Sequence, residues 1–209
     1  MMEGRYSLNA RQEVMLVNPS VPANTVPEFI TYAKTVPGKL TMASSGIGTP
    51  SHVVGELFKF VTGVNLVHLP YRGTAPALTD LLGGQVQVLF NPLTTSIEYI
   101  RAGKLRALAV TVMSRDEALP DIPTVAEFLP GFEASLWYGI AAPRNTPVEV
   151  IDKLNAEVNA ALADPKLKAQ IAEWGGTVLV GSPADFGKQI AEETEKWAKV
   201  IRSANIRAE

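Results

Sequence analysis

Short apolar runs alternate with longer amphipathic stretches along most of the chain. Each run is four to seven residues long and most are flanked by Gly, Pro, Asn or Ser, as β-strands commonly are. The stretches between them have the spacing of helices of about 10 to 15 residues. The alternation therefore predicts an α/β protein with a mainly parallel, helix-covered sheet. The predicted strands are EVMLV (13–17), KLTMAS (39–44), NLVHLP (65–70), QVQVLF (85–90), LRALAVT (105–111), LWYGIAA (136–142) and TVLV (177–180).

Helix starts are marked by a Ser, Thr or Asp directly before Pro, the usual order of a capping residue and a first helical residue. Thr25 with Glu28 and Thr146 with Glu149 also have the spacing of a capping box. Glycine closes several of these helices, because it takes a positive φ without steric cost. The Pro-marked starts are Thr49, Thr146, Asp164 and Ser182, and the closing glycines are Gly63, Gly83, Gly103 and Gly175.

A proline-rich segment, 114–135, divides the chain into two parts. It has few periodic apolar positions, which indicates an irregular connection. Residues 19–112 before it form a compact set of βα units. The part after it has two short predicted strands and three helices, too few for a complete sheet sandwich of its own.

The composition is that of an ordinary globular protein and excludes several kinds of function. Of 209 residues, 46% are hydrophobic and 19% are charged, so disorder is not favoured. A net charge of -2 gives no basic surface for nucleic acid. The absence of cysteine excludes disulfides, thiolate metal sites and cysteine nucleophiles. No apolar run reaches the roughly 18 residues of a spanning helix, and the opening MMEGRYSLNARQ lacks the pattern of a signal peptide.

The segment ASSGIGTPSH places a glycine-rich turn between a predicted strand and a predicted helix. Backbone N–H groups at a helix N-terminus favour an anion, and glycines let the anion approach closely. The alternative is an ordinary βα turn built from the same residues. The spacing matches neither a P-loop nor a dinucleotide fingerprint, so a carboxylate suits it better than a pyrophosphate. The candidate ligand residues are Ser44, Ser45, Gly46, Gly48, Thr49, Ser51 and His52.

Two further strand ends have polar residues of the same kind. Tyr71, Arg72 and Gly73 follow one strand, with Thr74 as the expected helix cap, and Asn91 follows another. Loops at the same ends of neighbouring parallel strands converge on one cleft. Arg72 could bind a carboxylate in a bidentate manner, although a surface or structural role is the commoner one. Asn91 before Pro92 is equally well explained as turn chemistry.

The two histidines do not predict catalysis or a metal site. His52 and Glu56 share a helix face, but two candidate ligands without a third make a poor metal site. His68 lies between apolar strand residues, where a hydrogen-bonded structural histidine is the usual case. Ser51 and His52 are adjacent, yet the G-x-S-x-G elbow is absent. We therefore expect no enzyme, no cofactor and no metal.

Long collinear strings resemble the substrate-binding receptors of tripartite tricarboxylate transporters, also called the Bordetella uptake gene family. The resemblance extends from about Glu13 to the C-terminus. Four strings carry it. The first comprises residues 34–90 and begins KTVPGKLTMASSGIGTPSH. The others are IRAGKLRALAVT (100–111), LPDIPTVAEFLPGFEASLWYGIAAP (119–143) and EKWAKVI (195–201).

This resemblance implies a type II periplasmic-binding-protein architecture in which one βα lobe is complete and the second is incomplete. Residues 1–18 would be a start outside the resemblance plus a crossing strand, 19–135 the lobe with the ligand loops, and 136–209 a returning fragment of the other lobe. It also implies that 44–49 and 71–74 face the ligand cleft. Family members are similar in capturing small organic anions through backbone N–H groups and water.

The predicted function is therefore a non-catalytic receptor for small organic carboxylates, periplasmic by resemblance, with a cytoplasmic location left open by the missing signal-peptide pattern. Membrane transporter subunits would be its partners if it is exported, and no nucleic acid is expected. The uncovered fragment 136–209 predicts a possible homo-oligomer. Two other functions remain open, an oligomeric remnant without ligand binding and an enzyme that uses Ser51, His52 or Arg72 on a carboxylate.

Overall fold

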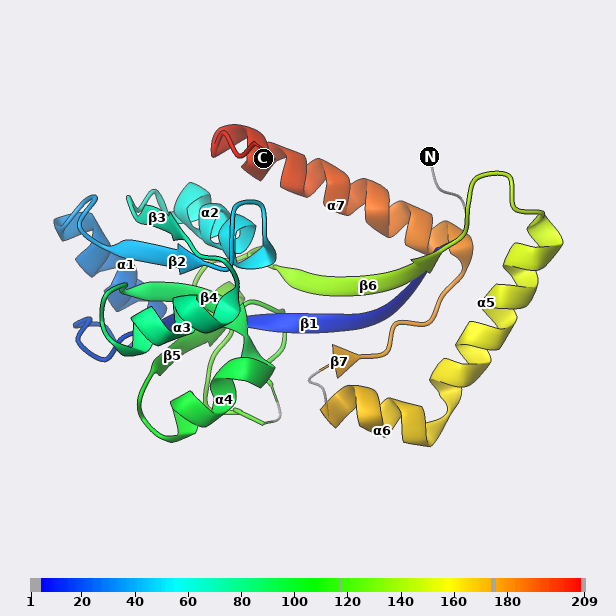
Figure 1. Ribbon diagram of the computed structural model, residues 1–209, viewed down its shortest axis with the longest axis horizontal. Coiled ribbons are helices and arrows are strands. Elements are labelled where there is room, and N and C mark those ends of the chain that lie inside the picture. The colour runs from blue at the N-terminus through cyan, green and yellow to red at the C-terminus, as the bar shows by residue number, and fades with distance from the viewer. Residues whose placement is uncertain (1–4, 117, 174–175, 208–209) are drawn as a thin grey trace. The chain divides into compact units, whose positions relative to one another are not determined.

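The computed structural model describes residues 5–116, 118–173 and 176–207, and the chain divides into two compact units (Figure 1). Unit 1 comprises Met1–Arg11 and Ser135–Ala198, and unit 2 comprises Gln12–Ala134 and Lys199–Glu209. The strands are β1 (Arg5–Val17), β2 (Thr41–Ser44), β3 (Val67–Pro70), β4 (Val88–Pro92), β5 (Arg106–Val110), β6 (Ser135–Ala141) and β7 (Gly176–Thr177). The helices are α1 (Val26–Thr35), α2 (Pro50–Thr62), α3 (Thr74–Leu82), α4 (Leu93–Arg101), α5 (Val148–Ala163), α6 (Pro165–Glu173), α7 (Pro183–Ser203) and the short 3-10 turn η1 (Val125–Glu127).

The sheet of unit 2 has the order β3-β2-β4-β1-β5. β2 runs parallel to both β3 and β4, as the βα pattern predicts. β1 lies between β4 and β5 and is antiparallel to both, with Val14 opposite Asn91 and Val110. The sheet is therefore mixed rather than purely parallel. The α/β prediction is confirmed, and β1 extends well beyond the predicted EVMLV.

Alternate residues of the central strands build two separate hydrophobic layers. Val14, Leu16 and Leu89 pack with the apolar faces of α3 and α4, including Ala77 and Leu81. On the other face, the Phe58 ring of α2 packs against Phe29 of α1 and Phe90 of β4, with centroid distances of 6.1 and 5.6 Å. Because both faces are covered, β1, β2 and β4 read as continuous apolar runs in the sequence.

Most helix boundaries agree with their capping signals, two differ, and one predicted capping box is incomplete. Thr25 accepts the N–H of Glu28, but the Glu28 carboxylate accepts from Asn24. The N-cap of α3 is Gly73 rather than Thr74, which is already helical. α5 begins one residue later than predicted, because the Thr146 hydroxyl donates to the Pro143 carbonyl instead of capping the helix.

The predicted closing glycines have different roles. Gly63 is the left-handed C-cap of α2, and Gly103 also has a positive φ. Gly83 ends α3 in the right-handed region, and the positive φ passes to Gly84. Gly175 lies outside the described residues. The proline-rich connection contains one full capping box, in which Thr124 and Glu127 bond to each other's backbone.

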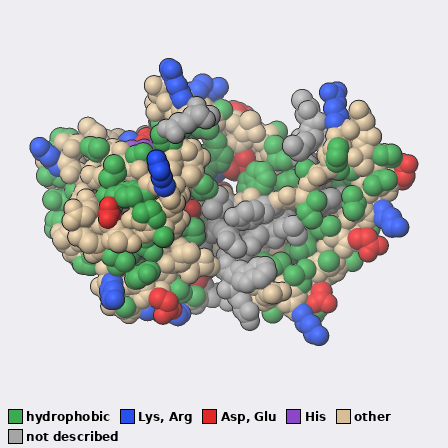
Figure 2. Space-filling view, in the orientation of Figure 1, with side chains coloured by type: hydrophobic (Ala, Val, Ile, Leu, Met, Phe, Trp, Pro, Cys, Tyr) green, Lys and Arg blue, Asp and Glu red, His purple; other side chains and the backbone are tan. Residues whose placement is uncertain are grey.

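Unit 1 is built on the first half of β1. β6 pairs with β1, and β7 pairs antiparallel with it at Ala10 and Arg11. The predicted strand 177–180 is wrong in extent, because β7 ends at Thr177. Several hydrophobic side chains remain exposed on this unit, and Figure 2 shows hydrophobic atoms among the charged ones on the visible face. The exposed residues are Ile140, Val148, Val150, Leu154 and Val180. No helix among the described residues is long and apolar enough to cross a membrane.

Candidate functional site

The polar loops after β2 and β3 are hydrogen-bonded to each other. β2 and β3 are parallel neighbours with Ser44 opposite Pro70. Beyond this pair, the Tyr71 N–H donates to the Ser44 carbonyl at 2.9 Å and the Gly73 N–H donates to the Ser45 carbonyl at 3.0 Å. The structure therefore brings the two predicted loops together at one edge of the sheet. We call residues 44–49 the glycine loop and residues 71–74 the arginine loop.

Ser51, in the first turn of α2, organises the glycine loop. The residue is 3% exposed, and its hydroxyl accepts the Ser45 N–H at 2.9 Å. It also lies 3.0 Å from the Ser45 hydroxyl and 3.1 Å from the Thr49 hydroxyl. Thr49 is the N-cap of α2 by position, but its hydroxyl donates to the Gly46 carbonyl at 2.7 Å. The loop is thus held by side-chain hydrogen bonds, and the Thr49 side chain does not cap the helix, although the Thr49 carbonyl accepts the His52 N–H at 3.0 Å.

The glycines of this loop have backbone conformations that other residues rarely adopt. Gly46 has φ 141° and Gly48 has φ 74°. A Cβ on Gly46 would lie 3.4 Å from the Tyr71 carbonyl oxygen, whereas a Cβ on Gly48 would meet nothing within 4 Å. Gly46 is therefore required by its backbone conformation, since an added Cβ would make only ordinary van der Waals contact, and Gly48 faces open space.

Two backbone N–H groups of the glycine loop already donate hydrogen bonds within the protein. The N–H groups of Gly46 and Gly48 donate to the Ser44 hydroxyl and to Nδ1 of His52. Several other N–H groups of the two loops and the following helix starts have no hydrogen-bond partner among the described residues, including those of Ile47, Ser51, Arg72 and Thr74. Ser51 and Thr74 stand in the first turns of α2 and α3, where the helix dipole adds positive potential. These donors are the ones available to an anion.

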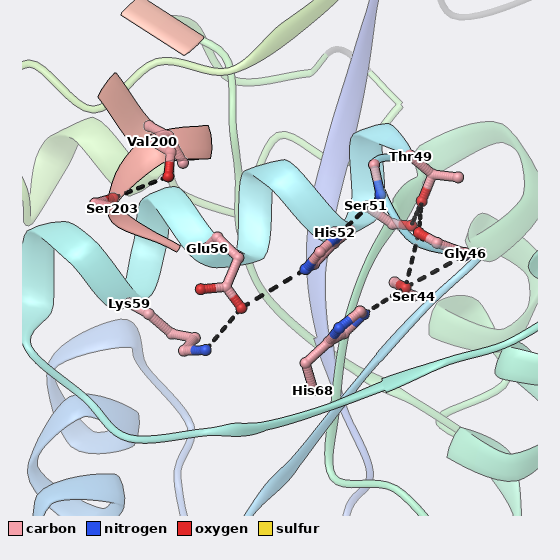
Figure 3. Close-up of polar contacts among 11 residues, drawn as sticks. Ser44, Gly46, Thr49, Ser51, His52, Glu56, Lys59, His68, Val200 and Ser203 are labelled. Atoms are coloured by element: carbon pink, nitrogen blue, oxygen red, sulfur yellow. Dashed lines mark hydrogen bonds and ion pairs between the residues drawn. The ribbon is translucent and has the colours of Figure 1, made fainter. Parts of the chain in front are cut away.

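The two imidazoles lie beside the glycine loop (Figure 3). The rings of His52, on α2, and His68, on β3, are stacked with centroids 3.8 Å apart and planes 6° apart. Nε2 of His68 lies 2.7 Å from the Ser44 hydroxyl. Burial lowers the pKa of His52, and burial together with the charge of His52 lowers the pKa of His68 to about 4. Both rings are therefore neutral at neutral pH.

The arginine loop presents its backbone and one cation. The Tyr71 hydroxyl donates to Asp80 on α3 at 2.6 Å, and partial burial with this bond raises the Tyr71 pKa to about 12. Arg72 is exposed and has no ion-pair partner among the described residues. The Tyr71 side chain thus anchors the loop to α3, while the Arg72 side chain is available to a ligand.

Asn91 reaches the same edge of the sheet but is buried. Only 1% of it is exposed, and its amide nitrogen donates to the hydroxyls of Thr95 and Ser96, each at 2.8 Å. These bonds tie the end of β4 to the first turn of α4. The donor that would make Asn91 a ligand contact is therefore already used.

The arrangement offers little for catalysis. The Ser44 hydroxyl and His68 Nε2 are close enough for a nucleophile and its base, a pairing that the sequence reading missed because it considered only the adjacent Ser51 and His52. Ser44 is fully buried and its hydroxyl donates to the Gly46 carbonyl, so a substrate cannot reach it. No group of three potential metal ligands occurs in the described part of the chain.

Comparison with known proteins shows which family the chain belongs to. The model of the tripartite tricarboxylate transporter family receptor matches residues 2–206. The chain belongs to this receptor family. The family match begins at residue 2, whereas the resemblance seen in the sequence alone began at about Glu13. The family is one of receptors rather than enzymes.

Relatives of this chain are found among curated proteins and solved structures. Protein BugT of Bordetella pertussis is 34% identical over 93% of this chain and 60% of its own length. A protein in the tcbD-tcbE intergenic region of Pseudomonas sp. strain P51 is 38% identical over 90% of this chain and 58% of its own. The chain thus spans about three fifths of the length of these curated relatives.

Solved structures confirm the periplasmic-binding-protein fold. The R. palustris protein Rpa4515 with adipate is 34% identical and superposes with a TM-score of 0.84, over 98% of this chain and 69% of that one. MatC from Rhodopseudomonas palustris with bound malate is 29% identical, with a TM-score of 0.79 over 95% and 69% of the two chains. The periplasmic binding protein BugD is 34% identical, with a TM-score of 0.81 over 100% and 71%. The family and the fold are therefore both as the sequence predicts.

Proposed function

We propose that this chain binds small organic carboxylates, as the receptor component of a tripartite tricarboxylate transport system, and that the ligand lies against the glycine and arginine loops. The observation that carries the proposal is the pair of hydrogen-bonded loops, which combine unpaired backbone donors with one exposed cation. No Asp or Glu occurs within either loop to oppose an anion. The proposed ligand residues are the predicted ones except Ser44 and Asn91, which are buried and already hydrogen-bonded, with Ile47 added through its N–H.

The donors suit a carboxylate for physical reasons. The N–H groups of Ile47 and Ser51 lie at the start of α2, and that of Thr74 lies at the start of α3. Both helix dipoles favour a negative charge there, and Arg72 can form charge-assisted bonds to a carboxylate oxygen. Backbone donors recognise the carboxylate group rather than the carbon skeleton, so the class of ligand follows from the site while the individual acid does not.

The relatives support this class of ligand. Two of the similar structures contain adipate and malate, which are both dicarboxylates. We infer that this chain takes a ligand of the same class without catalysis, that it acts in the periplasm, and that its partners are the membrane subunits of the transporter. In this proposal Asn91 shapes the start of α4 rather than contacting the ligand.

Isothermal titration calorimetry with malate, adipate and citrate tests the proposal, with the corresponding neutral amides as controls. We expect saturable binding of at least one acid and none of its amide. Arg72→Gln should weaken that binding about fivefold, the effect of losing roughly 1 kcal/mol of exposed charge interaction. Arg101→Gln is the matched control, because Arg101 is exposed on α4 and pairs with Glu98. Absence of binding to every acid, or equal binding of acid and amide, would contradict the proposal.

We also infer self-association through unit 1. Val148 and Val180 are 69% and 64% exposed, and three further apolar side chains of this unit are exposed with them. Such side chains favour association when they form a continuous patch. Light scattering over a range of protein concentrations tests this inference. A dimer that Val148→Lys dissociates would support it, and a monomer at all concentrations would contradict it.

A further inference from the structure

The two histidines of this chain are both attached to the glycine loop. Nδ1 of His52 accepts the N–H of Gly48 at 3.0 Å, and Nε2 of His68 is hydrogen-bonded to the hydroxyl of Ser44. The rings stack face to face between α2 and β3 (Figure 3). The imidazole pair therefore contacts the loop at Ser44 and at Gly48, near its beginning and near its end.

The bond from Gly48 exists in only one protonation state of His52. A neutral imidazole has one acceptor nitrogen, and the Gly48 N–H identifies it as Nδ1. In the imidazolium both nitrogens carry a proton and neither can accept. A proton taken up by His52 would thus place two donors against each other and release the Gly48 N–H. Gly48 has φ 74° and no atom within 4 Å of a Cβ position, so the loop has room to change conformation there.

The groups around His52 determine how readily it takes up that proton. Glu56 faces it from the same helix, with Oε1 3.8 Å from Nε2, and favours the charged ring. Lys59 lies 2.7 Å from the same carboxylate oxygen and opposes that effect. From β3, His68 stacks on the ring, and its own protonation is suppressed by a charge on His52. At most one of the two rings therefore carries a charge except in strong acid.

The direction of the pH effect follows from these environments. Burial is the main cause that lowers the pKa of both histidines below 6.5 in the folded protein. The two histidines therefore bind more protons in the unfolded chain than in the folded protein once the pH falls below about 6.5. The stability that the neutral rings give to the loop is fully present above that pH and is lost as the pH falls.

We propose that neutral His52 is a positioning residue for the glycine loop, which holds the Gly48 N–H in the binding conformation and releases it on protonation, so that carboxylate affinity falls in acid. This inference rests on the proposed function, because it concerns the same loop. His68 supports His52 by stacking and by holding Ser44 at the other attachment point. The ligand-binding loop is thereby linked to the pH of its surroundings.

NMR titration of the native chain from about pH 8 to about pH 5 tests the loop mechanism without any ligand. The chain has only two histidines, so the imidazole signals can be assigned with the single variant His68→Phe. We expect the Gly48 amide signal to shift with the same midpoint as the His52 ring, in the native chain and in His68→Phe. A Gly48 amide that stays constant while His52 titrates would overturn the proposal.

The affinity for malate and adipate over the same pH range tests the functional consequence. His52→Asn is the matched control, because the Asn oxygen replaces Nδ1 as an acceptor but does not titrate, and it also reports the titration of the ligand itself. We expect affinity to fall about tenfold further in the native chain than in His52→Asn. Equal pH dependence in the two proteins would overturn the proposal. Binding of neither acid at about pH 8 would overturn the proposed function, and the ligand-free titration would still decide the loop mechanism.

Discussion

Gly48 and Gly63 lie at opposite ends of α2 in the same left-handed conformation, with φ 74° and 69°. A Cβ added to either would meet no atom within 4 Å. The two positions therefore have the same backbone strain and the same free space, and they differ in location. Gly48 belongs to the glycine loop, whereas Gly63 caps the C-terminus of the helix by donating to the Lys59 carbonyl.

This relationship predicts different functional effects from the same substitution. Gly48→Ala and Gly63→Ala should each destabilise the fold by about 1 kcal/mol, the usual cost of Ala in the left-handed region. Only Gly48→Ala should weaken carboxylate binding, by tenfold or more on an order-of-magnitude basis. Urea denaturation and calorimetry of the two variants provide the measurements. Equal loss of affinity in both would indicate a general effect on the fold rather than a ligand site.

Ser51→Ala should loosen the glycine loop. Its hydroxyl is the acceptor for the Ser45 N–H and the centre of three hydrogen bonds. Removing it leaves a part-buried donor unsatisfied, which costs about 1 to 2 kcal/mol of stability. Ser45→Ala is the control, because it removes one hydroxyl contact and leaves the Ser45 N–H bonded. We expect Ser51→Ala to lower both the unfolding free energy and carboxylate affinity relative to the native chain, and a variant as stable as Ser45→Ala would refute this role.

Glu13 should make the fold less stable as the pH rises. The residue is 1% exposed, its Oε2 has no hydrogen-bond partner among the described residues, and burial raises its pKa to about 8. The folded state therefore keeps a proton between about pH 4.5 and pH 8 that the unfolded chain has lost, so stability falls as the pH rises through this window. At pH 7 the cost is roughly 3 kcal/mol.

Glu13→Gln removes the titrating group and keeps the shape of the side chain. We expect the difference in unfolding free energy between variant and native protein to grow in favour of the variant from pH 5 to pH 8. Denaturation curves at both pH values measure it. A constant difference would mean that Glu13 is ionised in the fold or has a partner.

Gly55 permits the close contact between α2 and β2. A Cβ at this position would collide with the thioether end of Met42, which is fully buried. Gly55→Ala should therefore cost about 1 to 3 kcal/mol through overpacking, offset in part by better helix propensity. Met42→Val shortens the side chain and should recover part of that loss in the double variant. Strict additivity of the two substitutions would show that the collision is relieved elsewhere.

The α/β fold, most helix starts and the ligand loops could be predicted because they are local. Pro after Thr, Asp or Ser marks a helix start through backbone geometry that involves few residues. The glycine loop is visible for the same reason, since Gly46 and Gly48 are needed where the chain turns from β2 into α2. Thr146 was wrongly predicted as a helix cap, because its hydroxyl instead donates to the nearby Pro143 carbonyl.

The sequence by itself determined the order of the elements, the family and the residues of both loops, because these depend on short-range pattern and on long collinear similarity. Only the tertiary structure decided that β1 is antiparallel between β4 and β5, that His52 and His68 stack beside the loop, and that the Asn91 amide is already bonded. The strand pairing and the ring stacking each join residues that are distant in the chain. The Asn91 bonds depend on which hydroxyl groups lie within reach of its buried amide. Neither spacing nor composition contains that information, since it arises when the sheet brings its strands together.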